Sequence, residues 1–81
     1  MKKRRYIVFN ELDNVGTLID NEINLSFIED DIILEPRIPF GHKFAIKHIP
    51  LGGSVIKYGV VIGHATVLID TGSHVHVHNC I

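Results

Sequence analysis

Histidine alternates with valine over residues His74–His78, and this is the part of the chain best suited to chemistry. Residues two apart in a β-strand point to the same face. We therefore expect three imidazoles in a row on one face, with Val75 and Val77 turned to the core. Histidine changes charge near neutral pH and is the commonest metal ligand. The row is either a metal-binding or acid–base surface or an ordinary solvated strand face.

His76 and His78 are the candidate metal ligands of this row. Side chains two residues apart on a strand begin ~6.6 Å apart. Imidazoles that start at this separation can converge on one ion with bonds of ~2.0–2.1 Å. Further ligands would have to come from another chain or from His42.

A second candidate group follows Gly41, in a segment that is bracketed by prolines and is therefore expected to be rigid. His42 could serve there as an acid, a base or a metal ligand, and Lys43 could bind a substrate carboxylate. The alternative is a loop histidine beside a solvated lysine.

Lys57 and Tyr58 stand at the end of an expected strand, just before Gly59. Neighbours in a strand point to opposite faces, so only one of the two can join the face that carries the histidines. Lys57 offers a cation for a carboxylate, and Tyr58 offers a phenolic donor. The alternative is a solvated lysine and a packed tyrosine with its hydroxyl at the rim.

Short strands must position these residues. Runs of β-branched and aromatic residues between glycines and prolines are typical of a mostly β domain, and we expect strands over residues 6–9, 23–28, 54–57, 60–62, 65–68 and 74–78. A polar turn is expected at Glu29–Asp31, and Pro36 and Pro39 keep the next apolar residues out of the middle of a sheet. Asp13–Leu18 begins with helix-capping residues but contains Gly16, so at most a short helical turn is expected there.

One stretch recurs at a spacing of twenty residues: Ile49–Val55 aligns with Ile69–Val75, with isoleucine, glycine and valine in register. Each copy predicts a buried isoleucine, a turn whose glycine can adopt a positive φ, and a valine that begins the next strand facing inward. Two copies are too few for a solenoid. They indicate two similar β-corners in one compact, pseudo-symmetric structure.

The composition indicates one small domain over residues 1–81. Hydrophobic residues make up 46% of the chain, enough to form a core. The net charge of −1 gives no electrostatic basis for nucleic-acid binding, and the basic residues within 1–5 are expected to form a flexible, solvated N-terminus. No run approaches the ~20 apolar residues of a membrane span. With a single cysteine, Cys80, this favours the cytoplasm.

From about Asp13 to Asn79, separated motifs resemble one family in order and spacing: Asp13-Asn14-Val15, Ile38–Lys43, Val55–Gly59, Val61–Thr66 and Val75–Asn79. It is the SAF-type small N-terminal domain of the altronate and galactarate dehydratases. The resemblance implies a β-clip fold, in which bent strands fold over on themselves. It also implies a hydro-lyase that removes water from a sugar acid with a divalent metal, iron or manganese.

The resemblance further implies that most of the catalytic machinery lies on a larger domain or subunit. This chain would be a small subunit or N-terminal domain, inactive alone, that caps a metal site. Its candidate site residues are His42, Lys57 and Tyr58 for catalysis, Lys43 and Asn79 for substrate binding, and His76 and His78 for the metal. No function is assigned to His48, His64 or His74, where the family pattern tends to carry other polar or charged residues. A homo-oligomer would also cover an apolar partner surface.

Two alternatives stay open. The same domain resembles the alpha subunit of sulfolactate sulfo-lyase, a free-standing chain whose reaction shares the proton removal but expels sulfite. The other alternative is a binding module without chemistry, which recognises a carbohydrate or a protein. It is distinguished by the lack of any effect of a large lyase subunit on activity.

Overall fold

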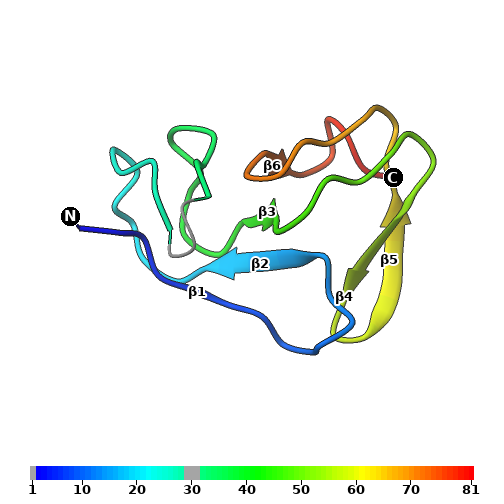
Figure 1. Cartoon of the computed structure of the whole chain (residues 1–81), viewed down its shortest axis with the longest axis horizontal. Coiled ribbons are helices and arrows are strands. Elements are labelled where there is room, and N and C mark those ends of the chain that lie inside the picture. Colours follow the sequence, from blue (N-terminus) through cyan, green and yellow to red (C-terminus); the bar gives the residue numbers. More distant parts are fainter. Residues whose placement is uncertain (1, 29–31) are drawn as a thin grey trace.

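A computed structural model describes residues 2–28 and 32–81. All regular elements of these residues are strands. The described residues therefore contain no helix that could cross a membrane. A four-stranded antiparallel sheet has the order β1 (Tyr6–Ile7), β2 (Val15–Leu18), β3 (Lys43–Ala45) and β6 (His74–Val75). β4 (Ser54–Lys57) and β5 (Val60–His64) form a separate antiparallel hairpin (Figure 1). The prediction of a small, mostly β domain is confirmed. The turn expected at Glu29–Asp31 lies outside the described residues.

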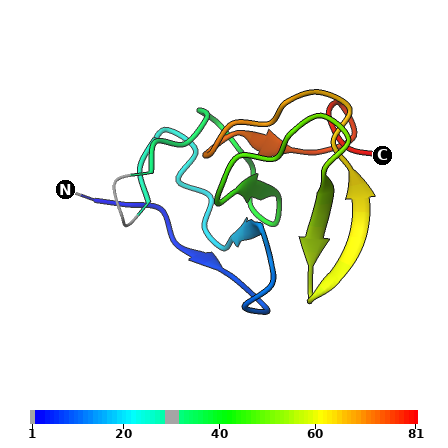
Figure 2. The ribbon, with the colours of Figure 1, turned by 45° about the vertical axis from the view of Figure 1, so that its right-hand side comes forward.

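The segment Asp13–Leu18 does not form the helical turn that its capping residues suggested; it leads into β2. Asp13 does bind backbone N–H groups, but they belong to the β4–β5 turn. Its carboxylate accepts hydrogen bonds from the N–H groups of Tyr58, at 3.1 Å, and Gly59, at 2.8 Å. Both residues have a positive φ, 58° and 74°, as two-residue hairpin turns of this kind require. Asp13 thus fixes the hairpin at the end of the molecule away from the N-terminus (Figure 2).

The twenty-residue repeat is confirmed, and its two copies are related by an approximate two-fold axis. Ile49 and Ile69 are each 1% exposed, and they exchange two backbone hydrogen bonds of 2.8 Å. The repeat glycines Gly52 and Gly72 have φ angles of 80° and 89°. Val55 and Val75, the second residues of β4 and β6, are fully buried. The axis therefore passes between the two isoleucines.

The strand pairing follows the same symmetry. The β3–β6 pair joins Lys43 to Val75, and the β4–β5 pair joins their counterparts twenty residues away, Gly63 and Val55. Each copy of the repeat therefore pairs a strand with a strand of the other copy. This exchange brings distant parts of the sequence into contact.

Two hydrophobic clusters hold these elements together. The first surrounds the two-fold axis and consists of Val15, Ala45, Ile49, Val55, Ala65, Ile69 and Val75. The second supports β2 and β3 and consists of Leu18, Ile28, Leu34, Ile38 and Phe44. Phe44 is fully buried, and its ring packs edge-on against Tyr6 with 5.3 Å between the centroids.

Two predicted strands, residues 23–28 and 65–68, are loops that carry only isolated bridges. In the first, a single bridge joins Phe27 to Ile33. Pro36 interrupts the neighbouring segment that would have to supply the rest of the ladder, because proline has no N–H to donate. Alternation of apolar residues alone therefore gave a wrong strand here.

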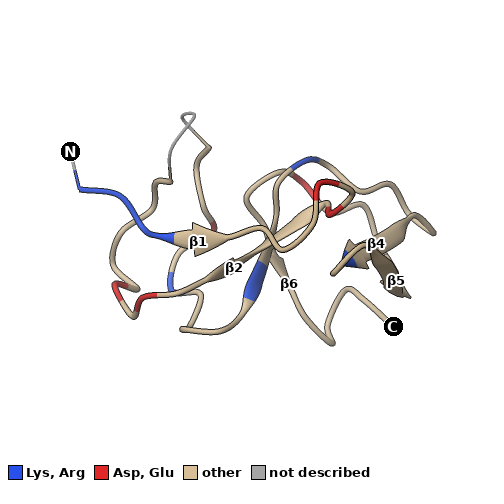
Figure 3. Cartoon of the chain, turned by 90° about the horizontal axis from the view of Figure 1, so that it is seen from below, with Lys and Arg blue, Asp and Glu red and all other residues tan. Residues whose placement is uncertain are grey.

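The basic N-terminal run is not wholly solvated, contrary to expectation. The Arg4 side chain is fully buried and donates a hydrogen bond to the Asp20 carboxylate at 2.9 Å. It also donates to the backbone oxygens of Asp20 and Ile38. Lys2, by contrast, pairs with Glu22 at the surface. Figure 3 shows the basic segment leading into β1. The hydrogen bonds of Arg4 tie this segment to the rest of the domain.

Candidate metal centre

The predicted histidine strand ends after two residues, because β6 comprises only His74–Val75 and the chain then turns. Val77, which was expected in the core, is 79% exposed. The turn is closed by the buried Asn79, whose Oδ1 accepts the His76 N–H at 3.0 Å and whose Nδ2 donates to the His74 carbonyl at 2.8 Å. Such side-chain bonds compete with a strand ladder. The prediction of three imidazoles in one strand row is therefore wrong.

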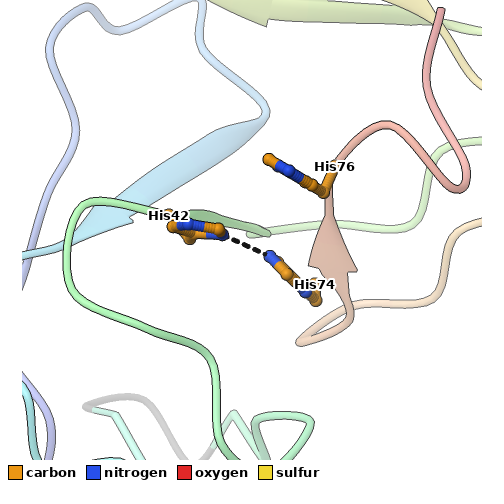
Figure 4. A group of neighbouring side chains, drawn as sticks. All are labelled: His42, His74 and His76. Carbon is orange, nitrogen blue, oxygen red and sulfur yellow. Dashed lines mark hydrogen bonds between the residues drawn. The ribbon is translucent and has the colours of Figure 1, made fainter.

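Histidines from two different elements meet instead. His42, just before β3, lies beside His74, which begins β6, and His76, which follows β6 (Figure 4). His42 Nδ1 and His74 Nε2 are hydrogen-bonded at 2.9 Å. The His76 ring stacks on His42, with 4.7 Å between the centroids and 24° between the planes. One ring nitrogen from each of the three residues lies within 4.8 Å of the others, so we name this group the His42–His74–His76 cluster.

The strand register and a tight turn place His42 in the cluster. The β3–β6 register, extended by one residue, puts His42 opposite His76. Before His42, Gly41 has a φ of 82°, and its N–H donates to the Leu18 carbonyl at 2.8 Å. The Leu18 N–H in turn donates to the His42 carbonyl at 2.9 Å. The segment that carries His42 is thus bound to the end of β2.

The cluster keeps His74 neutral. Burial, followed by the positive charges of His42, His76, His78 and Lys43, lowers the pKa of His74 from 6.5 to about 4. The pKa of His76 is also lowered, first by desolvation and then by the charges of His42, Lys43 and His78. Metals bind the neutral imidazole. At pH 7, therefore, His74 is in the form that a metal requires.

Three imidazoles at this spacing fit a divalent transition metal. Imidazole suits zinc, copper, iron and nickel. Two nitrogens that bind one ion at ~2.1 Å lie ~3–4 Å apart, so the cluster needs only small ring movements. Binding would replace the hydrogen bond between His42 and His74, because both nitrogens would turn to the ion.

The other residues predicted at the C-terminal site lie around the cluster. Lys43 is half-buried on β3, and its charge acts on His74 and His76. His78 is exposed and lies outside the cluster of three, with its ring centroid 5.5 Å from that of His74. Asn79 is 6% exposed, and both ends of its amide bind the backbone.

Lys57 and Tyr58 lie elsewhere, at the β4–β5 turn. Lys57 Nζ is 5.0 Å from the centroid of the Tyr58 ring and 5.5 Å from that of Phe9. The expectation that the two side chains point to opposite faces is wrong. Tyr58 has left the strand and has a φ of 58°, which brings its ring to the side of Lys57.

The sequence prediction missed His74, which it grouped with His48 and His64. His48 and His64 are indeed exposed and outside the cluster. The signal that could have found the cluster lay in the repeat. Ile49 pairs with Ile69 in an antiparallel register. His42 lies seven residues before Ile49 and His76 lies seven residues after Ile69, so this register brings His42 opposite His76.

Comparison with known proteins identifies the domain. Residues 4–81 match the family model of the altronate/galactarate dehydratase SAF domain. The chain belongs to this family. The SAF domain is 38% identical to altronate dehydratase of Escherichia coli over 78 residues, which are 93% of this chain and 16% of that protein. It is 42% identical to the (2R)-sulfolactate sulfo-lyase subunit alpha of Chromohalobacter salexigens over 64 residues, which are 79% of this chain and 63% of that protein.

A second dehydratase is also matched over only a small share of its length. The SAF domain is 40% identical to galactarate dehydratase (L-threo-forming) of Escherichia coli over 70 residues, and it covers 13% of that protein. The chain thus spans less than a fifth of the dehydratases and less than two thirds of the sulfo-lyase subunit. In the two dehydratases the SAF domain is a small part of a larger protein.

Proposed function

We propose that this SAF domain is part of a sugar-acid hydro-lyase of the altronate dehydratase type and caps a metal-dependent active site built mainly by a larger polypeptide. The His42–His74–His76 cluster, in a domain whose relatives are dehydratases, is the observation that supports this most. The proposed location is the cytoplasm, which the single cysteine favours.

The reaction explains why such a cluster is useful. Dehydration of a sugar acid removes a weakly acidic proton next to the carboxylate and expels the neighbouring hydroxyl. A divalent cation held by His42, His74 and His76 would stabilise the negative charge that develops there. Of the two metals that the family resemblance implies, the imidazole donors favour iron over manganese.

The residues around the cluster are the proposed contacts with the substrate. Lys43 would attract the substrate carboxylate, because its ammonium lies close enough to lower the pKa values of His74 and His76. His78, exposed beside His74, would stand at the rim toward the substrate. A catalytic role for Lys57 and Tyr58 stays a prediction, and it would place a second contact with the substrate at the β4–β5 turn.

The surface of β5 supports a large partner. Val60, Val61 and Ile62 follow one another and are 57%, 54% and 43% exposed. An uncharged strand with three exposed apolar residues is the kind of surface that another chain covers. The proposed partner is the larger lyase polypeptide; a second copy of this chain is the alternative.

A sulfo-lyase is the second candidate function. The chain covers a larger share of the sulfolactate sulfo-lyase subunit alpha than of the dehydratases, 63% against 16% and 13%. That reaction also begins with removal of a proton next to a carboxylate. The same cluster would serve it, and only the leaving group would differ.

The test combines the purified chain with the larger lyase polypeptide and iron, and assays altronate and (2R)-sulfolactate. Activity is expected only from the two chains together, and the product names the leaving group. His76→Ala should lower kcat by at least ~100-fold because a metal ligand is lost. His48→Ala removes an exposed histidine outside the cluster and should change nothing. Activity of the chain alone, or full activity in His76→Ala, would contradict the proposal.

A further inference from the structure

Two buried asparagines make the same pair of hydrogen bonds in the two halves of the repeat. Asn79 Oδ1 accepts the His76 N–H, and its Nδ2 donates to the His74 carbonyl. Asn14 Oδ1 accepts the Ile56 N–H at 2.8 Å, and its Nδ2 donates to the Ser54 carbonyl at 2.8 Å. Ser54 and Ile56 are the counterparts of the two histidines, twenty residues earlier.

The backbones of the two asparagines are also equivalent. The Asn14 carbonyl accepts the N–H of Ile46 at 3.0 Å, and the Asn79 carbonyl accepts the N–H of Thr66 at 2.9 Å. Thr66 is the counterpart of Ile46. Asn14 and Asn79 are 8% and 6% exposed. Each asparagine therefore makes equivalent hydrogen bonds to the backbone in its own half of the fold, although both asparagines lie outside the aligned repeat segments.

The two asparagines differ in the residues whose backbone they bind. Asn14 forms its hydrogen bonds with a serine and an isoleucine, whereas Asn79 forms them with two members of the His42–His74–His76 cluster. We infer that Asn79 is a positioning residue of the metal centre, which acts by fixing the backbone of His74 and His76. This inference rests on the proposed metal site, and it assigns Asn79 to the histidines rather than to direct contact with the substrate.

The physical reason is the cost of ordering His76. His76 is exposed, and the turn closed by Asn79 fixes the direction of its backbone. The Asn79 N–H also donates to the His76 carbonyl at 3.1 Å, so both polar groups of the His76 backbone are bound to one residue. Without the side-chain bonds the imidazole would have to be ordered when the metal binds. Loss of such outer partners weakens metal binding by ~10–100-fold.

The experiment titrates the metal-free chain with Co²⁺ and follows the visible absorption of the bound ion. The variants are Asn79→Ala and its symmetry-matched control Asn14→Ala, which loses the same two kinds of hydrogen bond. Both should lower the Tm to a similar degree. Asn79→Ala should raise the Kd for Co²⁺ by ~10–100-fold, whereas Asn14→Ala should raise it by less than ~3-fold because the hydrogen bonds it loses lie in the other half of the fold.

Each outcome decides a separate point. If the unaltered chain does not bind Co²⁺, the proposed metal centre itself is wrong. If it binds and the two variants weaken binding equally, Asn79 is only structural and the inference is wrong. If Asn79→Ala does not fold, the comparison is made between Asn79→Ser and Asn14→Ser. Serine adds no charge beside the histidines and is too short to bind both backbone groups, so the same difference in Kd between the two positions is expected.

Discussion

At the scale of single residues, the lowered pKa of His74 determines the charge of this side chain in the cluster. Its pKa of about 4 keeps the imidazole neutral through most of the range in which an ordinary histidine charges. The cause is first burial and then the positive charges of the neighbouring side chains. A neutral His74 can share a hydrogen bond with His42, in a direction that depends on the tautomers, or bind a metal without first losing the proton of an imidazolium.

The first prediction concerns the titration of His74 in the metal-free chain. Its folded pKa lies below its unfolded value of 6.5, so the unfolded chain binds the proton more readily. The stability that neutral His74 contributes is therefore complete above pH 6.5 and is lost as the pH falls toward 4. Imidazole ¹⁵N NMR should show His74 neutral at pH 6, and His74→Gln should flatten the fall of Tm between pH 6.5 and 4. A His74 pKa at or above 6.5 would contradict this.

The second prediction concerns the buried ion pair of Arg4 and Asp20. Burial acts to raise the pKa of Asp20, but hydrogen bonds from the backbone of Arg5 and Glu22 and from the Arg4 side chain outweigh it, and the pKa is lowered. Arg4→Met leaves this carboxylate unpaired and should cost ~3–5 kcal/mol of unfolding free energy. Lys2→Met removes the exposed pair and should cost ~0–1 kcal/mol. Equal losses in urea unfolding would show that burial does not distinguish the two pairs.

The sequence allowed candidate residues of the site to be chosen by their type, but it did not show which of them lie together. The sequence indicated His42 and His76, because histidines beside glycine and in alternation are recognisable patterns. His74 was missed because its importance depends on the register of β3 against β6. The turn at Asn79 was missed because a side-chain hydrogen bond, not apolar alternation, ends β6.

At the scale of elements, the approximate two-fold axis between Ile49 and Ile69 organises the protein. The sequence predicted the repeat correctly, since buried isoleucines and turn glycines have a local signature. It did not predict that residues 23–28 form a loop, because a ladder requires a suitable partner and Pro36 interrupts the one available. Local patterns thus specified the corners, whereas pairing between distant segments specified the strands.

The third prediction uses the two repeat glycines as a matched pair. Both have a positive φ, so alanine at either position costs ~1–2 kcal/mol from backbone strain. A Cβ on Gly52 would meet nothing within 4 Å, but a Cβ on Gly72 would lie 2.0 Å from the Ile33 carbonyl oxygen. Gly72→Ala should therefore lower the unfolding free energy much more than Gly52→Ala. Equal effects in chemical denaturation would contradict the close packing of Gly72 against Ile33.

At the scale of the whole molecule, the domain exposes the apolar residues of β5. The two dehydratase relatives carry this domain as a small part of a larger protein. Covering β5 would bury apolar surface, which favours association. In the proposed function, the metal centre and this surface would be the two places where the domain contacts the larger polypeptide.

The fourth prediction concerns this association. Val61→Lys places a charge on β5, and because Val61 is 54% exposed the domain should stay folded. Binding to the larger lyase polypeptide, measured by calorimetry, should weaken. Ile33→Lys is the control, since Ile33 is 66% exposed in a loop outside β5. Unchanged binding in Val61→Lys, or equal loss in both variants, would contradict a partner surface on β5.

The most direct test of the metal centre is X-ray absorption spectroscopy of the Co²⁺-loaded chain at the cobalt edge. Three imidazole nitrogens at ~2.0–2.1 Å are expected, and the number should fall by one in His42→Ala and stay the same in His78→Ala. These results would place the ion in the His42–His74–His76 cluster. A shell of oxygen ligands alone, or a loss of one nitrogen in His78→Ala and none in His42→Ala, would contradict the proposed centre.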